Sequence, residues 1–277
     1  MVGDRLAAIV GSVSGGDIAI AALLLVTALW EVGRPEHAAD DAAGQRWFSN
    51  FSLFAINEGA RLWLAPLIAA ATGPWPFHLP LPAASGLRYL VLLPALDLTV
   101  YVLHRLFHRI PFLWRLHAIH HTDVSVDVST TVRHHPVEAI VMVFALVAVG
   151  GLLGATPREI AIYTTLAFAV QLTAHANVGL PPFVAAGLGL VIVTPSFHRF
   201  HHACDLTFRD ANYGEILVVW DRLFGTAVAS PQAAHAPSQF GVAAYLAPRF
   251  RSLAWILLQP FLPRPAETAL REGSEIA

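Results

Sequence analysis

The sequence of 277 residues is short of charged residues. They make up 13% of the chain, whereas hydrophobic residues make up 56%, and soluble domains carry about 25% charged residues. With a mean hydropathy of +0.57, most of the chain is expected to lie in lipid rather than water. The net charge of −2 offers no basic surface, which excludes a nucleic-acid-binding protein. The single cysteine, Cys204, excludes an internal disulfide and a metal site built from thiolates.

Histidine, in contrast, is abundant and clustered. Eight of the fourteen histidines follow the spacings H-x3-H, H-x2-H-H and H-x2-H-H, in the clusters His104/His108, His117/His120/His121 and His198/His201/His202. Helix positions i, i+3 and i+4 share one face, so each cluster is expected to direct its imidazoles at a single point. Neutral imidazole binds iron, zinc or copper. A lone histidine is more often a satisfied polar residue, but three such clusters predict a metal site.

Apolar stretches suggest a membrane protein. A helix needs about 20 residues to cross a bilayer, and the candidates are Asp17–Val32, Phe48–Ala71, Gly86–Phe107, Val137–Gly154 and Glu159–Gly179. We expect an all-α, integral membrane helical bundle of about four to five spans, whose first span is retained rather than removed as a signal peptide. Thr156 before Pro157 is a good N-cap, which predicts a helical hairpin between the last two stretches.

Arginine carries the positive charge and sets the expected orientation. Arg105, Arg109, Arg115 and Arg133 lie between the third and fourth stretches, and most of the other arginines follow the fifth. The positive-inside rule therefore places both histidine-bearing segments on the cytoplasmic side and the N-terminus outside. Two segments far apart in sequence should meet on one face of the membrane. We predict a single composite di-metal site in a cytoplasmic helical cap.

We divide the chain into three parts. Residues 1–86 are expected to form N-terminal membrane helices, residues 87–226 the histidine-bearing catalytic domain, and residues 227–277 a C-terminal amphipathic segment and tail. Thr72–Gly86 is predicted as an external loop, and Pro181–Val193 as an interfacial or re-entrant segment. Arg249–Leu262 has the pattern of an amphipathic helix at the membrane surface, and Pro263–Ala277 is expected to be loose.

Two further histidines and two aspartates could complete the site. His175 lies in an apolar helix, where a histidine is costly unless it is paired or ligated. Of the neighbours His134 and His135, either one could contribute. Asp97, on the helical stripe of His104, and Asp123 are candidates to accept the Nδ1–H of a ligand imidazole. The alternatives are that Asp97 bonds another helix and that Asp123 is an exposed N-cap. We take His37, His78 and His235 as incidental.

The number of nitrogens indicates which metal. Eight to ten imidazoles exceed the four ligands of a tetrahedral zinc ion and suit two ions with about five ligands each and open positions for oxygen. Zinc cannot change its redox state, whereas iron can. The E-x-x-H motif of carboxylate-rich di-iron bundles does not occur in the sequence.

With these features the sequence resembles the fatty acid hydroxylase superfamily, also called the sterol desaturase family, of membrane di-iron oxygenases. The three histidine boxes match in order and spacing, and the resemblance covers about Leu87 to Thr226. Connecting elements also match: Arg133-x-His135-Pro136-x-Glu138, Phe168 to Asn177, Thr194-Pro195-Ser196, Asn212-Tyr213-Gly214 and Trp220 to Thr226. These elements look closest to the alkylglycerol monooxygenase and bacterial sterol-desaturase branches.

The resemblance implies a set of ligands and a reaction. His135 rather than His134 would be a ligand, because the Pro and Glu of the pattern follow it. Two iron ions, replaced by zinc in some overexpressed protein, would activate O2 to hydroxylate or desaturate a C–H bond of a membrane lipid. The protein would lie in a bacterial inner membrane with the histidine site on the cytoplasmic side.

Electrons would come from outside the chain. There is no G-x-G-x-x-G motif, no set of ferredoxin cysteines and no attached cytochrome b5 module. A ferredoxin or cytochrome b5 type of donor with its reductase is therefore the expected partner. We expect an acidic donor to dock on a basic surface that includes Arg199, Arg209 and Arg222.

Two other functions compete with the oxygenase. A b-haem carrier needs one histidine from each of two helices, which leaves the adjacent His120 and His121 without a role. A divalent-metal transporter is the stronger alternative, but it should place ligands at mid-membrane together with carboxylates. Metal that stays bound at about two ions per chain would favour the oxygenase, and readily exchanged metal the transporter.

Overall fold

The described part of the protein is helical. The computed structural model describes residues 15–38, 43–71, 79, 81, 86–228 and 239–263. Within these residues the chain forms α-helices and 3-10 helices, together with two isolated β-bridges, Ile192–Leu217 and Ala203–Phe240. The expected all-α class is confirmed.

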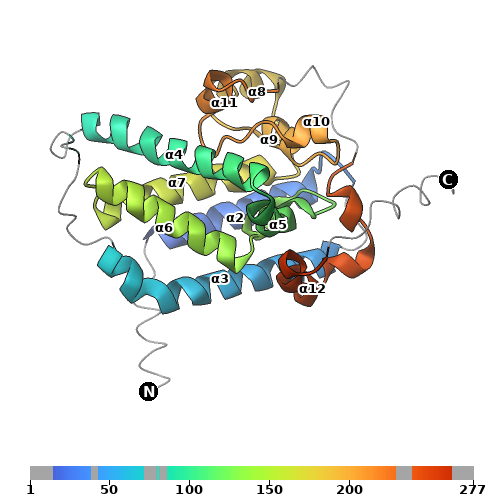
Figure 1. The fold of residues 1–277 in the computed structure, drawn as a ribbon. Helices are drawn as coiled ribbons and strands as arrows, with labels where there is room; N and C mark the ends of the chain where they lie inside the picture. Colours follow the sequence, from blue (N-terminus) through green and yellow to red (C-terminus); the bar gives the residue numbers. More distant parts are fainter. Residues whose placement is uncertain are drawn as a thin grey trace.

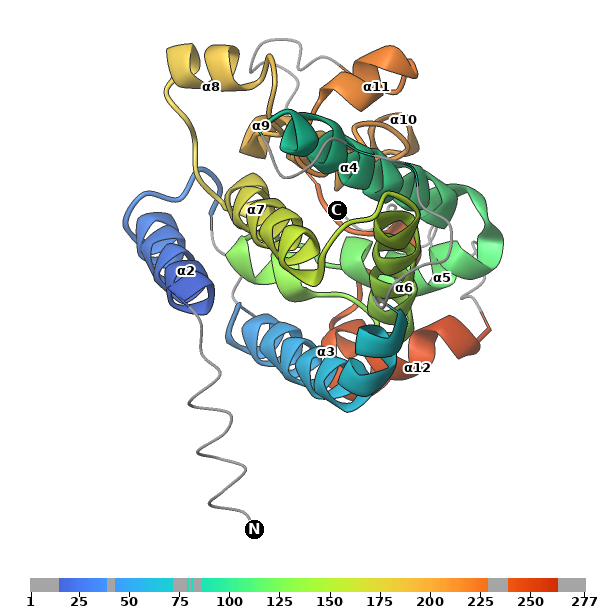
Figure 2. The ribbon, with the colours of Figure 1, turned by 90° about the vertical axis from the view of Figure 1, so that its left-hand side faces the viewer.

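Long helices make up the body of the molecule (Figure 1): α2 Gly15–Gly33, α3 Ala43–Ala71, α4 Gly86–Arg109, α6 Pro136–Leu152 and α7 Pro157–His175. They coincide with the five apolar stretches of the sequence. In the second view, α7 lies between α2 and α4, and α6 lies between α3 and α4 (Figure 2). Short helices follow or connect the long ones: α5 Pro111–His121, η1 Val128–Val132, α8 Pro182–Leu188, α9 Pro195–His201, α10 Leu206–Arg209, α11 Val219–Leu223, η2 Ala243–Tyr245, η3 Pro248–Arg251, α12 Leu253–Leu258 and η4 Gln259–Phe261.

The predicted hairpin between α6 and α7 is confirmed. The side chain of Thr156 accepts a hydrogen bond from the backbone N–H of Glu159, and the Glu159 carboxylate accepts one from the backbone N–H of Thr156. This capping box satisfies two N–H groups that the first turn of a helix leaves without partners. Arg88 at the start of α4 donates to Glu159 at 2.5 Å, so the hairpin is tied to the neighbouring helix.

The apolar core sets the alignment of α4, α6 and α7. Leu92, Leu96 and Val100 of α4 pack with Leu146 of α6 and with two buried side chains of α7. Full burial of each large side chain contributes about 1.5–3 kcal/mol. With the three helices held in this way, the end of α4, the beginning of α6 and the end of α7 lie at the same end of the bundle. Residues far apart in sequence can therefore meet there.

The outer surface is rich in large apolar side chains. Trp63 of α3 is 80% exposed, Leu90 of α4 is 73% exposed and Leu29 of α2 is 62% exposed. Among the described helices, Gly86–Arg109 alone is long and apolar enough to cross a membrane, while Ala19–Gly33 and Pro136–Leu152 are apolar but shorter. The expected number of four to five spans stays a prediction.

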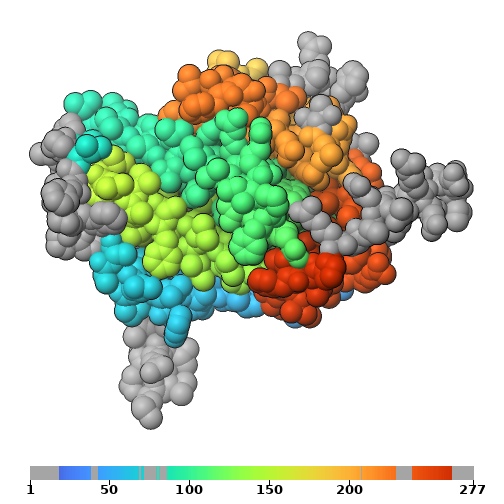
Figure 3. Space-filling view, viewed as in Figure 1, coloured from blue at the N-terminus to red at the C-terminus, as the bar shows by residue number. Residues whose placement is uncertain are grey.

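The C-terminal segment differs from the prediction. Arg249–Leu262 does not form one amphipathic surface helix but lies across η3, α12 and η4. Ile256 of α12 is fully buried against Leu53 of α3 and Ile119 of α5, and the segment covers this side of the molecule (Figure 3). Pro181–Val193 contains the short helix α8. The predicted loop Thr72–Gly86 and the predicted loose tail lie largely outside the described residues.

Candidate metal centre

Nine histidines converge in two groups at one end of the bundle. The first group contains His104, His108, His117, His121 and His201, and the second contains His120, His175, His198 and His202. Within each group the ligand nitrogens lie within 4.8 Å of one another. The structure therefore brings together nine of the ten histidines singled out in the sequence, and it brings them from α4, α5, α7 and α9 to one place.

Each H-x2-H-H box serves both groups. We expected each box to aim at a single point, but adjacent residues on a helix point about 100° apart. His117 and His121, at i and i+4, belong to the first group, and His120 belongs to the second. The other box is divided in the opposite way: His198 and His202 belong to the second group, and His201 belongs to the first. The paired histidines are thus the element that places two groups side by side.

Hydrogen bonds from Nδ1 orient several of the imidazoles. His104 Nδ1 lies 2.9 Å from the carbonyl oxygen of Tyr213, and His201 Nδ1 lies 2.7 Å from that of Ala211. His175 Nδ1 is bonded in the same way to the Gln171 carbonyl, at 2.9 Å. A carbonyl oxygen only accepts, so Nδ1 carries the hydrogen in these rings and Nε2 presents a lone pair.

The arrangement of the Nε2 atoms fits bound metal ions. His104 Nε2 lies 2.9 Å from His201 Nε2, although both rings have their hydrogen on Nδ1, so two lone pairs face each other. In the second group, His175 Nε2 lies 3.0 Å from His198 Nε2. The Nε2 of His108 is buried and has no hydrogen-bond partner within the described part of the chain. Converging lone pairs repel one another unless a cation lies among them, and this set of donors suits metals that bind imidazole.

Five of the converging histidines are neutral at physiological pH. Burial, reinforced by the neighbouring imidazoles, lowers their pKa values well below the ordinary value. This holds for His120, His121, His198, His201 and His202. Because only a neutral imidazole has a lone pair to offer, the buried groups are prepared to bind metal without first losing protons.

Two carboxylates that the sequence analysis did not assign to the site contact the histidines. Glu138 of α6 accepts from His117 Nδ1 at 2.7 Å and from His134 Nδ1 at 2.9 Å. Asp210 is bonded to His108 Nδ1 at 3.1 Å, and its side chain is 53% exposed. Glu138 follows His134 by four residues and belongs to the motif Arg133-x-His135-Pro136-x-Glu138, so the sequence could have indicated its role. No comparable pattern pointed to Asp210.

His135 lies in neither group, contrary to the expectation drawn from the resemblance. Its Nδ1 accepts from the backbone N–H of Val137 and caps the beginning of α6. The neighbouring His134 instead stacks on His120, with ring centroids 4.4 Å apart, and contacts Glu138. The turn that starts α6 at Pro136 directs the His134 ring toward the site and the His135 ring away from it.

Of the two roles considered for Asp97, the structure confirms that it bonds another helix, since the Tyr163 hydroxyl of α7 donates to it at 3.3 Å. It contacts no histidine among the described residues, and it also accepts hydrogen bonds from the backbone N–H groups of Ile216 and Leu217 and from the Trp220 indole. Asp221 binds the same loop from the other side, through the backbone N–H groups of Tyr213 and Gly214. The two aspartates therefore hold the loop whose carbonyl at Tyr213 orients His104.

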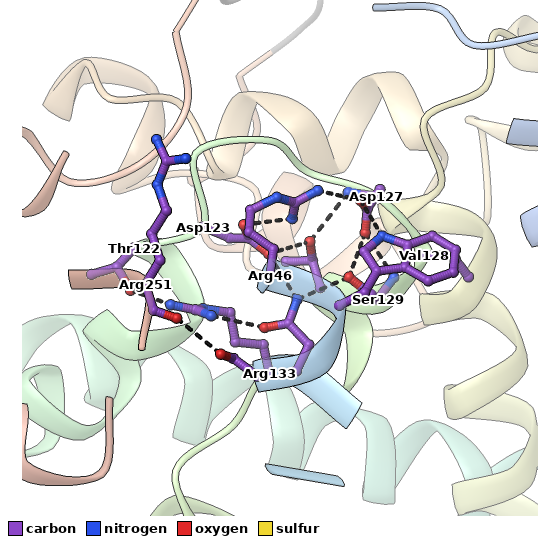
Figure 4. Close-up of polar contacts among 12 residues, drawn as sticks. Arg46, Thr122, Asp123, Asp127, Val128, Ser129, Arg133 and Arg251 are labelled. Atoms are coloured by element: carbon purple, nitrogen blue, oxygen red, sulfur yellow. Dashed lines mark hydrogen bonds and ion pairs between the residues drawn. The ribbon is translucent and has the colours of Figure 1, made fainter. Parts of the chain in front are cut away.

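Asp123, which follows the end of α5, belongs to a buried polar network (Figure 4). Arg46 of α3 donates to Asp123 at 2.6 Å and also binds Asp127. Asn50 donates to Asp123 at 3.1 Å, and Arg133 donates to the carbonyl oxygen of Ile119 at 2.8 Å. Although burial alone would raise it, Arg46 and Arg133 hold the pKa of Asp123 below its ordinary value. The network joins α3 to the chain on either side of η1, rather than contacting a histidine.

The N-terminal helix α2 is attached to the same region. The Glu31 carboxylate accepts from the backbone N–H groups of Val128, at 2.8 Å, and Asn177, at 2.6 Å. Arg199, predicted to lie on a docking surface, is instead 4% exposed. It pairs with Glu36 and donates to the carbonyl oxygens of Ala176 and Val178. Arg199 is therefore a structural residue that joins α9 to the segments after α2 and α7.

Comparisons with known proteins agree with this geometry. The family model described as fatty acid hydroxylase matches residues 89–226, which include all nine converging histidines. The chain belongs to the fatty acid hydroxylase family. No solved structure matches the chain.

Several curated proteins of this kind are similar to the chain. An ornithine lipid hydroxylase, OlsE, of Rhizobium tropici is 38% identical over 46% of this chain and 38% of its own length. An alkylglycerol monooxygenase of Danio rerio is 30% identical over 54% of this chain and 33% of its own length. A very-long-chain aldehyde decarbonylase of Oryza sativa is 30% identical over 46% of this chain and 20% of its own length. The similarity thus spans well under half of each relative.

In this member of the family a cavity of about 310 Å³ leads to the histidines. His104, His117, His120, His175 and His198 form one wall of it. The rest of the lining is largely apolar and comes from α3, α4, α6 and α7, through Phe54, Val100, Met142, Val143, Leu146, Ala167 and Phe168. Both histidine groups therefore face one apolar chamber between the long helices.

Proposed function

We propose that this chain is a membrane lipid oxygenase, which uses O2, two iron ions and electrons from a separate donor to hydroxylate or desaturate a lipid C–H bond. The observation that carries the proposal is the row of five converging histidines along a cavity whose exposed lining is mostly apolar. A cavity of this composition favours a hydrocarbon chain over a polar metabolite. The histidines would then lie beside the carbon to be oxidised.

The two histidine groups would each hold one ion. Five imidazoles of the first group and four of the second would be their ligands, and His104 and His198 also line the cavity. Iron, when bound, supplies the redox chemistry that O2 activation requires. Zinc binds imidazole at least as tightly as Fe(II), so overexpressed protein is expected to contain some zinc.

The chain's own residues orient the ligands and exclude water. Glu138 and the carbonyl oxygens of Tyr213, Ala211 and Gln171 hold four rings with Nε2 toward the metal positions. Partners of this kind commonly change metal affinity or activity by about 10–100-fold. The apolar lining keeps bulk water from the reacting carbon, which limits the loss of reactive species to side reactions.

We propose that the substrate enters from the lipid bilayer. The cavity lies among α3, α4, α6 and α7, and α4 is the helix long and apolar enough to span a membrane. A lipid chain could then reach the histidines without crossing water. The names of the relatives include a hydroxylase of ornithine lipids and monooxygenases of alkylglycerols, which favours a lipid substrate. We retain the bacterial inner membrane, with the histidine end in the cytoplasm, as the location.

We keep an external electron donor in the proposal, but change its docking surface. Arg222 donates to the carbonyl oxygens of Leu190 and Gly189. Arg199 is buried and unavailable, but the first histidine group comes close to the surface through His108 and the half-exposed Asp210. Arg209, whose guanidinium carbon lies 4.7 Å from the centroid of the Trp114 ring, directly precedes Asp210 in sequence. We propose that a ferredoxin or cytochrome b5 type of donor binds at this side of α5 and α10.

The experiment is a reconstitution. Purified protein, loaded anaerobically with Fe(II), is supplied with O2, an electron donor and membrane lipids, and the lipids are compared by mass spectrometry with a reaction lacking iron. We expect an oxidised or desaturated lipid and O2 consumption in the complete reaction only. Iron at close to two ions per chain that does not exchange with free metal would support the oxygenase over the transporter. Rapid exchange with no lipid product would contradict the proposal.

A further inference from the structure

One carboxyl group in the cavity has no partner among the described residues. Glu215, in the loop between α10 and α11, lines the cavity together with His104, His134 and His198. Its neighbours in the lining include Val100, and no lysine or arginine belongs to the described part of that lining. The other acids of the lining are paired: Glu138 with His117, and Glu58 with Arg61. A polar group in an apolar space is costly unless something binds it.

The backbone around Glu215 is held firmly from three sides. The backbone N–H groups of Ile216 and Leu217 donate to Asp97 at 3.0 and 3.1 Å. The carbonyl oxygen of Glu215 accepts from Gln171 Nε2 at 2.5 Å, and the N–H of Gly214 donates to Asp221 at 2.7 Å. The side chain is therefore presented to the cavity by a fixed loop. A fixed, unsatisfied polar group in a cavity is the usual form of a specificity contact.

The charges around Glu215 indicate what it binds. Burial raises its pKa to about 8, with Asp97 and Glu138 adding to the effect and His134 opposing it. A neutral carboxyl group donates one hydrogen bond, and its natural partner is an uncharged oxygen. An anionic headgroup at this depth would meet acidic neighbours and no arginine or lysine of the described lining. This position therefore favours an uncharged polar group over a free fatty acid carboxylate.

We propose that Glu215 is a polar subsite of the cavity that binds an ether, ester, amide or hydroxyl oxygen of the substrate. The oxygen would lie within a few bonds of the carbon that faces the histidine wall. The substrate class is then a lipid functionalised near the site of oxidation, rather than a plain hydrocarbon chain or a terminal carboxylate. This inference rests on the proposed lipid oxygenase function and specifies the class of substrate that the same site would bind.

The test measures binding separately from turnover. Full-length, metal-loaded protein in detergent is titrated with three lipids that carry an ether, an ester or an amide, each paired with an analogue in which methylene groups replace the polar atoms. Wild-type protein should bind at least one oxygen-bearing lipid about tenfold more tightly than its analogue, as expected for one buried hydrogen bond. Glu215→Leu should remove that preference, and Glu215→Gln, which still has an N–H donor, should keep most of it.

Glu58→Gln is the matched control, because Glu58 also lines the cavity but is ion-paired with Arg61 and is 40% exposed. It should leave the oxygen preference unchanged. Unchanged metal content in each variant would show that the fold is intact. A preference that survives Glu215→Leu, or that is absent from wild type for all three pairs, would overturn the subsite. If the preference follows Glu215 but no lipid is oxidised under any condition, the subsite stands and the oxygenase proposal fails.

Discussion

Arg46 donates a 2.6 Å hydrogen bond to Asp123, across 77 residues of sequence and between two side chains shielded from solvent. Arg46 lies in α3, outside the segment that the family model matches, whereas Asp123 follows the metal-facing His121 by two residues. The helix α3 is thus joined by a buried ion pair to the segment that directly follows the histidines of α5. It supports the fold around the site, in addition to any role it has in the membrane.

The first prediction follows from this ion pair. Arg46→Ala leaves Asp123 and Asp127 buried without their cation, and breaking such a pair costs about 3–5 kcal/mol. Thermal unfolding in detergent should show a large loss of stability. Arg61→Ala is the control, since its pair with Glu58 is exposed and contributes at most about 1 kcal/mol. Similar losses in the two variants would show that the buried pair has no special role.

The second prediction concerns metal content. His108→Ala removes a ligand from the first group and His202→Ala one from the second, so each should lower metal toward one ion per chain. His135→Ala should retain both ions, because His135 caps α6 and lies in neither group. Elemental analysis of protein prepared without chelators measures the outcome. Loss of metal in His135→Ala with retention in His202→Ala would refute the assignment of ligands.

The third prediction concerns Glu138, which accepts from both His117 and His134. Glu138→Gln removes the negative charge that orients the His117 ring, and metal affinity should fall by about 10–100-fold. Competition with a chelator of known affinity measures the change. Asp210→Asn should have a smaller effect, because Asp210 is 53% exposed and water can replace its carboxylate. The reverse order would show that the surface carboxylate is the more important of the two.

The fourth prediction separates the cavity from the metal. Ala139 of α6 lines the cavity, and Ala139→Phe should fill part of it. Lipid oxidation should fall strongly while metal content stays unchanged, because no histidine group is touched. Ala161→Phe, at an exposed position of α7, should leave both unchanged. Full activity in Ala139→Phe would mean that the substrate reaches the histidines by another route.

The fifth prediction concerns pH and Glu215. Its folded pKa of about 8 lies above the ordinary 4.5, so the folded state binds this proton more tightly than the unfolded state. The resulting stability is present below about pH 4.5 and is lost as the pH rises toward 8. Between pH 5 and 8 the melting temperature of wild type should therefore fall relative to that of Glu215→Gln.

Neighbouring groups modify this pH effect and provide its control. Asp97 of α4, Glu138 of α6 and Tyr163 of α7 face Glu215 together with His134, and all remain in both proteins, so the difference between the two isolates Glu215. Bound cations lower the pKa of a nearby carboxyl group. The difference should accordingly be larger in metal-free than in metal-loaded protein. If the melting temperatures of wild type and Glu215→Gln change in parallel with pH, in metal-free and in metal-loaded protein, Glu215 is ionised throughout this pH range.

The sequence predicted the elements that depend on local rules. Apolar stretches of the length of a membrane span located the long helices, and the Thr156 cap followed from the chemistry of helix starts. The three histidine boxes were sufficient to predict a composite site, because ligand spacing on a helix is a local property. The split of each H-x2-H-H box between two groups was overlooked, although the 100° step between adjacent helix residues implies it.

Tertiary structure decided which side chains meet. His134 and His135 are adjacent, and only the direction of the turn before α6 determines that His134 faces Glu138 while His135 caps the helix. Asp97 lies on the same stripe as His104, yet it binds the 216–220 loop that packs against it. Charge and spacing predict that a carboxylate or an arginine will find a partner in a buried site. Which residue becomes the partner depends on the distant segments that helix packing places next to the side chain, and only the tertiary structure determines this.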